Sequence, residues 1–309
     1  MQPLMSLDEQ INIPALIGAL LLCLGYLPSL WQEQQHPQPE APASQTTWRL
    51  AAFLTALVAM LAVLVTPIDR LARSQLFLMH MLQVIVLSTL CAPLLLIAMP
   101  TRLRRRLLPG EDQHRAGGAA VLRFLTQPLA ASILYNGFFL LWHLPPLYLV
   151  TCQQALLYDL ALVILLLMAL LNWWPLLGPT AVSRRLSYPA QMLYAFLDGQ
   201  PIDIFAFLLV FSGTIFYPIY ARQAHPLIAP LSDQEAAGAM LLVPGLVDLL
   251  VMTPLFFRWL AELEARARLR DQQLQQIVEA EEQRRASEPL SEPSEDQPAT
   301  PSPGAPRSE

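Results

Sequence analysis

The sequence predicts an all-α membrane protein, a bundle of seven transmembrane helices. Only 14% of the 309 residues are charged and 54% are hydrophobic, whereas a soluble domain carries about 25% charged residues. The hydrophobic residues form continuous runs and do not alternate with polar ones, which favours helices over the strands of a membrane barrel. A helix crosses the hydrocarbon core with about 20 mainly apolar residues. Seven segments meet this requirement: residues 12–31, 50–67, 76–98, 122–143, 153–175, 190–217 and 237–259.

The first of these segments is expected to stay in the protein as a helix. No Lys or Arg precedes residues 13–30, and no small-x-small cleavage site follows them directly. A secretory signal peptide would carry both features.

Arginines predict the orientation of the chain. All 19 basic residues are Arg, and basic residues concentrate in the cytoplasmic loops of membrane proteins. If the seven segments alternate across the membrane, thirteen Arg in or near the loops fall on one face and three, Arg70, Arg73 and Arg222, fall on the other. The sequence therefore predicts an N-terminus outside and a C-terminus inside.

Composition divides the chain into three parts. Residues 1–260 hold the seven-helix transmembrane domain. Residues 261–285 are rich in Ala, Glu, Arg, Leu and Gln, which predicts a helical extension into the cytoplasm. Residues 286–309 are mainly Ser, Pro, Glu and Asp, and such a segment cannot bury enough apolar surface to fold. We expect it to be a disordered cytoplasmic tail.

His80 is a candidate metal ligand near the outer end of a predicted span. It lies between Met79 and Met81, and thioether and imidazole groups suit Cu(I). An ionisable side chain inside a membrane is costly and is a functional hypothesis by default. On a helix, however, the two methionines point about 100° to either side of His80, so a metal site needs another element. The alternative is a neutral imidazole hydrogen-bonded to a carbonyl.

His143 closes the fourth predicted span on the same outer face. Pro145 and Pro146 follow it and should end the helix. A ligand and a helix-end cap are both consistent with this position. Cys152 lies just beyond, where it would serve either as a third soft ligand or as a small buried thiol.

Four acidic residues lie within the predicted spans, and no Arg is expected at a matching depth. Gly199-Gln200-Pro201 should break or kink the helix that carries two of them. We favour protonated carboxyls that hold helices together over a path for protons or cations. The four are Asp159, Asp198, Asp203 and Asp248.

Several classes of function lack their sequence signatures. GxSxG, HExxH, a Gly-rich phosphate loop and a repeated Cys–His cluster are all absent, so we do not expect an enzyme. No basic patch with interleaved aromatic residues indicates nucleic acid as a partner.

Seven motifs follow one another over most of residues 50–260. They are Thr66-Pro67-Ile68-Asp69, Met79-His80-Met81-Leu82-Gln83, Trp142-His143-Leu144-Pro145-Pro146-Leu147-Tyr148, Trp173-Trp174-Pro175-Leu176-Leu177-Gly178-Pro179, Tyr217-Pro218-Ile219-Tyr220, Pro230-Leu231-Ser232-Asp233-Gln234 and Val243-Pro244-Gly245. In this order the motifs resemble the CtaG-type (Caa3_CtaG) integral-membrane assembly factors of haem–copper cytochrome c oxidase. The resemblance implies seven spans, in agreement with the orientation predicted from Arg.

The chain departs from that family at expected ligand positions. The resemblance implies a second His four residues after His80 and a His-x-x-Glu-His motif before the tryptophan pair. These positions hold Val84, Tyr158, Ala161 and Leu162. The chain is therefore expected to be a divergent member that keeps two of about five ligands.

The resemblance implies a multi-pass protein of the bacterial cytoplasmic (inner) membrane. It would aid copper-centre maturation of the oxidase at the outer face, with oxidase subunits, the lipid bilayer and copper chaperones as partners. His80 and His143, together with Met79, Met81 or Cys152, would bind Cu(I) transiently. Because histidines are missing, a metal-free structural partner of the oxidase remains an alternative. The acidic residues keep a small proton- or cation-coupled transporter as a further one.

Overall fold

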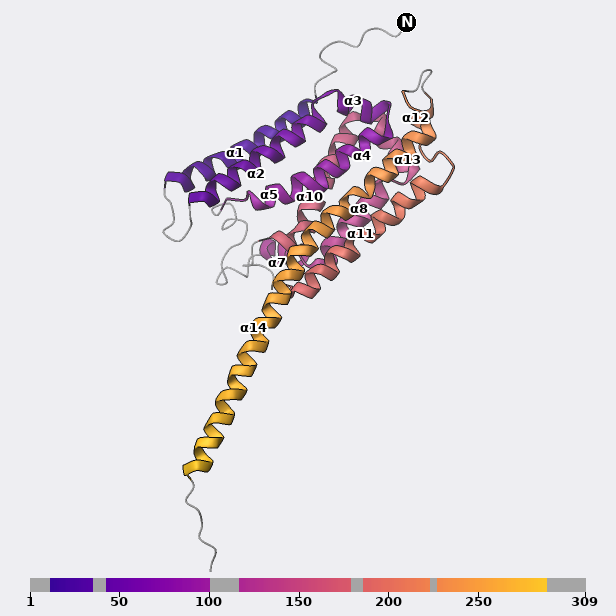
Figure 1. The fold of residues 1–309 in the computed structure, drawn as a ribbon. Coiled ribbons are helices and arrows are strands. Elements are labelled where there is room, and N and C mark those ends of the chain that lie inside the picture. Colours follow the sequence, from indigo (N-terminus) through magenta and orange to yellow (C-terminus); the bar gives the residue numbers. More distant parts are fainter. Residues whose placement is uncertain (1–11, 36–42, 101–116, 179–185, 223–226, 288–309) are drawn as a thin grey trace, which may run out of the picture. The chain divides into compact units, whose positions relative to one another are not determined.

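The computed structural model describes residues 12–35, 43–100, 117–178, 186–222 and 227–287. The chain divides into two units, Met1–Trp259 and Leu260–Glu309. Every regular element in the described ranges is a helix (Figure 1). The predicted all-α class is therefore confirmed.

The long apolar helices of the first unit agree with most of the predicted spans. They are α1 (Ile13–Gln35), α2 (Ala43–Leu64), α4 (Phe77–Ile85) continued by the π-helix η2 (Val86–Cys91) and α5 (Ala92–Ile97), α10 (Ala155–Leu177), α11 (Tyr188–Phe211), and α13 (Pro230–Leu241) followed by α14 (Val243–Ser287). In the described part of the chain, six helical segments are long and apolar enough to cross a membrane. A seventh is reached if α8 (Pro128–Trp142) and α9 (Pro145–Gln153), which meet at a bend of 74°, form one span.

Shorter helices connect these segments. They are α3 (Pro67–Ser74), α7 (Gly117–Leu125) and α12 (Pro218–Ala221). Thr66 caps α3, since its side chain accepts a hydrogen bond from the backbone N of Ile68. The helix α3 carries two of the three Arg residues that the sequence assigns to the outer face.

The break after His143 is confirmed, but the two prolines do more than end a helix. His143 is the C-cap of α8, and Leu144 is extended at φ −62° and ψ 126°, as the residue before a proline prefers. Pro145 then begins α9, because proline fits the first turn of a helix, where no partner exists for its missing N–H. His143 thus lies at a sharp corner between two helices.

Of the break or kink predicted at Gly199-Gln200-Pro201, the break is wrong. The helix α11 runs without interruption from Tyr188 to Phe211 with Pro201 inside it. Membrane helices tolerate proline, because neighbouring helices and local adjustments satisfy the freed backbone groups. Asp198 and Asp203 are therefore carried by one continuous helix.

The first unit is packed around α10 and α13. The helix α10 contacts α8, η2 and α5, while α13 contacts both α11 and α4 (Figure 1). Gly238 of α13 is needed for the close approach to α11, since a Cβ there would lie 2.8 Å from the carbonyl oxygen of Ala206. Large apolar side chains such as Leu21, Leu129 and Phe211 are exposed, as a surface that faces lipid requires.

The start of α4 is held by a side chain from α13. Leu76 at the N-cap offers no capping side chain, and the first N–H groups of a helix have no partner within it. The buried carboxyl group of Asp233 accepts from the backbone N of Phe77 (2.7 Å) and of Leu78 (3.1 Å). This contact fixes the turn that carries His80.

The second unit contributes helical residues as far as Ser287. Its described side chains are exposed, and pairs such as Arg266–Glu262 (2.6 Å) are spaced i,i+4 along the helix. The predicted helical extension 261–285 falls within α14. From residue 288 on, the predicted disordered tail lies outside the described residues.

Candidate functional site

His80 and His143, predicted separately as candidate ligands, meet in the interior of the first unit. Their Nε2 atoms lie 3.2 Å apart, and the two residues are 0% and 1% exposed. His80 comes from the first turns of α4, and His143 comes from the corner between α8 and α9. Two imidazole nitrogens from helices distant in the sequence therefore face each other at one point.

Aromatic rings enclose this histidine pair. The ring of His143 stacks on that of Phe139, with 4.2 Å between ring centres, and lies nearly parallel to that of Tyr148, with 5.9 Å between centres. The ring of Trp142 meets that of His80 edge-on, with 5.1 Å between centres. The ring centre of Tyr148 lies 4.8 Å from that of His80. Such walls exclude water and strengthen electrostatic interactions between the groups inside.

The second nitrogen of each imidazole has a defined partner. His143 Nδ1 lies 2.7 Å from the carbonyl oxygen of Phe139, one turn earlier in α8. His80 Nδ1 lies 2.6 Å from the hydroxyl of Tyr158 in α10. Both rings are therefore fixed in orientation by contacts on the side away from the pair.

A buried polar network continues outward from Tyr158. The Tyr158 hydroxyl donates to Gln83 Oε1 at 2.7 Å. Gln83 Nε2 donates to the carbonyl oxygen of Val63 and to Asp69 Oδ1, each at 2.8 Å. Arg73 Nε donates in turn to Asp69 Oδ2 at 2.7 Å. The network joins α2, α3, α4 and α10 around the histidine pair.

The expectation that Asp159 has no Arg partner is wrong. Arg73 forms an ion pair with Asp159, and its guanidinium lies 4.4 Å from the centre of the Tyr158 ring. Asn12 also donates to Asp159, at 3.1 Å. Burial alone would lower the pKa of Arg73, but the hydrogen bonds and charges of Asp69 and Asp159 raise it above its ordinary value. The sequence placed Arg73 in a loop, whereas the short helix α3 turns its side chain towards α10.

The other predicted ligands are less closely tied to the pair. Met79 is half-buried and Met81 is fully buried, on opposite sides of His80 around the helix. Cys152 is half-buried in α9. Within the described ranges, no group of three or more His, Cys, Asp or Glu residues is placed to hold a metal ion, so Cys152 does not complete a set with the two histidines.

Sequence reasoning missed Gln83, Asp69 and Arg73 as parts of this site. Gln83 gave a signal, since it is a polar residue within the apolar run of α4. Asp69 and Arg73 are spaced i,i+4 in α3, which predicts an ion pair but not its contact with Tyr158. Tyr158 was noted only as a replacement for an expected histidine.

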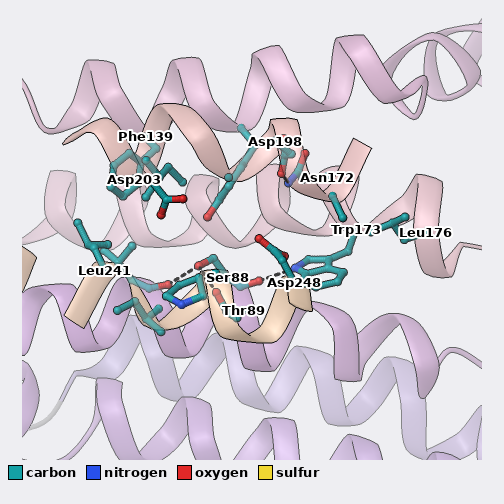
Figure 2. Close-up of a pocket in the computed structure, with 18 of the residues that line it drawn as sticks. Ser88, Thr89, Phe139, Asn172, Trp173, Leu176, Asp198, Asp203, Leu241 and Asp248 are labelled. Atoms are coloured by element: carbon teal, nitrogen blue, oxygen red, sulfur yellow. Dashed lines mark hydrogen bonds between the residues drawn. The ribbon is translucent and has the colours of Figure 1, made fainter. Parts of the chain in front are cut away.

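Three of the acidic residues line a separate cavity of about 60 Å³ (Figure 2). At about 10–15 Å³ for each molecule, this is room for a few waters. Asp198 accepts from Asn136 Nδ2 at 3.0 Å and from Asn172 Nδ2 at 2.5 Å, and so joins α11 to α8 and α10. This agrees with a carboxyl group that holds helices together.

Asp203 and Asp248 both lie close to Gly199 in the same cavity. A Cβ placed on Gly199 would lie 3.2 Å from Asp248 Oδ2 and 3.9 Å from Asp203 Oδ2. The two acids therefore line one shared space (Figure 2).

A bundle of long apolar helices with buried polar groups between them defines a multi-pass membrane protein. The family model described as cytochrome c oxidase caa3 assembly factor (Caa3_CtaG) matches residues 24–262, and the chain belongs to that family. No curated protein and no solved structure matches the chain. The resemblance stated from the motifs is confirmed.

Proposed function

We propose that this protein holds Cu(I) transiently between His80 and His143 during copper-centre maturation of a haem–copper cytochrome c oxidase. The observation that supports this most directly is the 3.2 Å separation of two buried Nε2 atoms. Imidazole nitrogen is a suitable copper ligand, and membership of an oxidase assembly factor family supports the oxidase as the recipient. Cu(I) is cargo in this scheme, taken up and passed on.

The residues present fit such an ion with a small adjustment. Metal–nitrogen bonds to imidazole are about 2.0 Å long, so two bonds in line would need about 4 Å between the nitrogens. The rings of His80 and His143 would have to separate by less than about 1 Å. Two nitrogens are a small ligand set, and a weakly held ion suits transfer better than storage.

The distribution of Arg supports placing this site at the outer face of the membrane. His80 follows the start of α4 at Phe77 by three residues, and His143 ends α8. Both ends lie on the side to which the sequence assigns few Arg residues. An oxidase copper centre that is assembled at the outer face would lie on the same side of the membrane as this pair.

The surrounding residues would hold the ion and keep water out. The aromatic rings of Phe139, Trp142 and Tyr148 enclose the pair. Tyr217 donates to the carbonyl oxygen of His143 at 2.6 Å and so braces the corner that carries it. The protein would thus orient the two imidazole rings and keep water away from the ion, and the ion would bind through its affinity for nitrogen.

Titration with Cu(I) tests this function. The purified protein in detergent is titrated in competition with a chromogenic Cu(I) chelator. We expect one ion per chain, lost in both His80→Ala and His143→Ala. His114→Ala, at a histidine that the sequence places in a predicted cytoplasmic loop, is the matched control and should keep the ion. An unchanged copper stoichiometry in the His80→Ala/His143→Ala double variant, with a normal size-exclusion profile, would remove the copper role.

A metal-free partner of the oxidase is the second candidate function. It is favoured because the described residues contain no set of three His, Cys, Asp or Glu ligands. Deletion of the gene should lower oxidase abundance under either function, and added copper then separates the two. Rescue by added copper supports the copper role, whereas oxidase abundance that stays low in copper-supplemented cells supports the metal-free one.

A further inference from the structure

The hydrogen-bond network beside the histidine pair fixes where its protons lie. Asp69 and the carbonyl of Val63 only accept hydrogen bonds, and Gln83 reaches both with one terminal atom at 2.8 Å. That atom must be the amide nitrogen, because an amide oxygen cannot donate. Gln83 therefore turns its Oε1 towards Tyr158.

Tyr158 transmits this constraint to His80. A tyrosine hydroxyl has one hydrogen, and Gln83 Oε1 can only accept it, over 2.7 Å. The Tyr158 oxygen is then the acceptor in its 2.6 Å contact with His80 Nδ1. His80 must carry its proton on Nδ1, which leaves Nε2 with a free lone pair in the neutral ring.

The backbone imposes the same proton position on His143. Its Nδ1 faces the carbonyl oxygen of Phe139 at 2.7 Å, and a carbonyl only accepts. The proton of His143 is therefore also on Nδ1, and its Nε2 is also bare.

The two bare nitrogens face each other at 3.2 Å. Among the described residues, neither Nε2 has another hydrogen-bond partner, and both side chains are sealed from solvent. Two lone pairs aimed at each other in a dry interior lack the donor that buried polar groups normally have. A positive ion between them would satisfy both nitrogens at once.

We infer that Tyr158 is a positioning residue that, through Gln83, holds His80 as the Nδ1–H tautomer, so that the pair is a preformed two-nitrogen site for a soft monovalent cation. The choice of ion rests on the proposed copper function, but the tautomer does not. A Zn²⁺ site usually needs four ligands, and Mg²⁺ and Ca²⁺ need oxygen, so two imidazoles favour Cu(I) and its analogue Ag(I). Tyr158 bonds the far side of the ring and does not itself reach the ion.

Replacement of Tyr158 has a specific predicted effect. Tyr158→Phe removes the acceptor for Nδ1–H but keeps the ring that lies under Arg73. His80 should then move its proton to Nε2 and donate it to His143 across the 3.2 Å gap, which blocks the ion site. Gln83→Met should act in the same direction while Tyr158 remains. A hydroxyl that no longer donates to Gln83 is free to donate to His80 Nδ1, and the Nε2–H tautomer of His80 then satisfies both of its nitrogens.

Tyr26→Phe is the matched control. Tyr26 is also buried in the bundle, but its hydroxyl donates to the carbonyl oxygen of Leu95 in α5 at 3.0 Å and to neither imidazole. This variant removes a buried tyrosine hydroxyl without touching the predicted proton positions.

The test reads the tautomer of the metal-free protein and its Ag(I) affinity separately. In ¹⁵N-histidine NMR spectra, assigned with His80→Gln and His143→Gln, we expect protonated Nδ1 and bare Nε2 for both residues. Tyr158→Phe and Gln83→Met should protonate His80 Nε2 and weaken Ag(I) binding by about 10–100-fold, with no change for Tyr26→Phe. A protonated Nε2 in the metal-free wild type, on either histidine, overturns the inference.

The two readouts separate this inference from the copper function. If the predicted tautomers are found but Cu(I) does not bind, the positioning role of Tyr158 stands and the copper function fails. If Cu(I) binds while His80 carries its proton on Nε2, the copper function stands and the positioning role is overturned.

Discussion

Arg73 of α3 and Asp159 of α10 form an ion pair, and the Arg73 guanidinium lies over the ring of the neighbouring residue Tyr158. The pair retains only 19% and 13% side-chain exposure. The short connecting helix α3 thereby places Arg73 at the end of the hydrogen-bond network that leads to His80. The Arg73 guanidinium links Asp69 in α3 to Asp159 in α10.

The first prediction is that Arg73→Met destabilises the protein by about 2 kcal/mol. The change leaves two partly buried carboxyl groups, Asp69 and Asp159, without their common partner, and such a loss costs more than loss of an exposed pair. Thermal unfolding of the purified protein in detergent measures it. Arg266→Met breaks an exposed i,i+4 pair with Glu262 and should cost less than about 0.5 kcal/mol. Equal shifts in the two variants would contradict the prediction.

Removal of the carboxyl group of Asp233 should affect both stability and metal binding. In Asp233→Ala the backbone N–H groups of Phe77 and Leu78 lose their shared acceptor, at a cost of about 1–2 kcal/mol. Because the same turn carries His80, Cu(I) binding should also weaken. Asp233→Asn keeps one acceptor oxygen and should lie between the wild type and Asp233→Ala in unfolding temperature and in Cu(I) titration. Cu(I) affinity that is unchanged in Asp233→Ala would separate the cap from the site.

Even the smallest side chain at Gly238 should destabilise the bundle. In Gly238→Ala the new methyl group would lie 2.8 Å from both the Ala206 carbonyl oxygen and Leu209 Cβ, so α13 and α11 must move apart, at a cost of about 1–3 kcal/mol. Gly137→Ala is the control, because nothing lies within 4 Å of the added Cβ there. Thermal unfolding should fall only in Gly238→Ala. A similar fall in both would point to an effect of glycine on the helix and not to close packing.

The stability of the protein should respond differently to changes at two of the carboxyl groups in the acidic cavity. Asp198→Ala leaves the Asn172 amide nitrogen without its acceptor and removes one of the acceptors of Asn136, and it should cost about 2–3 kcal/mol. Asp203→Asn should instead raise stability, because it removes a like charge close to Asp248. Unfolding curves of both variants measure the difference. If the protein is a transporter, reconstituted vesicles should take up solute and lose this uptake in Asp203→Asn. If the cavity is purely structural, vesicles with the wild-type protein should show no uptake.

Much of the fold could be predicted because lipid imposes a strong and local constraint on the sequence. Apolar runs of sufficient length indicated the spans, and Pro145 and Pro146 indicated the corner after His143. The break predicted at Pro201 was wrong, since a proline breaks a membrane helix only when neighbouring groups do not satisfy the freed backbone groups. That compensation is a property of packing and cannot be seen in one segment.

The candidate site was predictable residue by residue but not as an arrangement. His80 and His143 stood out because an ionisable group inside a span is costly. Their meeting at 3.2 Å depends on how α4 and α8 rotate and pack, which hydropathy does not encode. The same holds for Tyr158 in α10 and Gln83 in α4. These two residues are 75 positions apart in the chain, and their roles depend on how the two helices pack.

Complete burial of the two imidazoles has a kinetic consequence. No ion or solvent molecule can reach a residue that is 0% or 1% exposed without a transient displacement of the rings around it. Entry and exit are therefore limited by the rate of local opening and not by diffusion. A site of this kind exchanges its contents slowly even when its equilibrium affinity is modest.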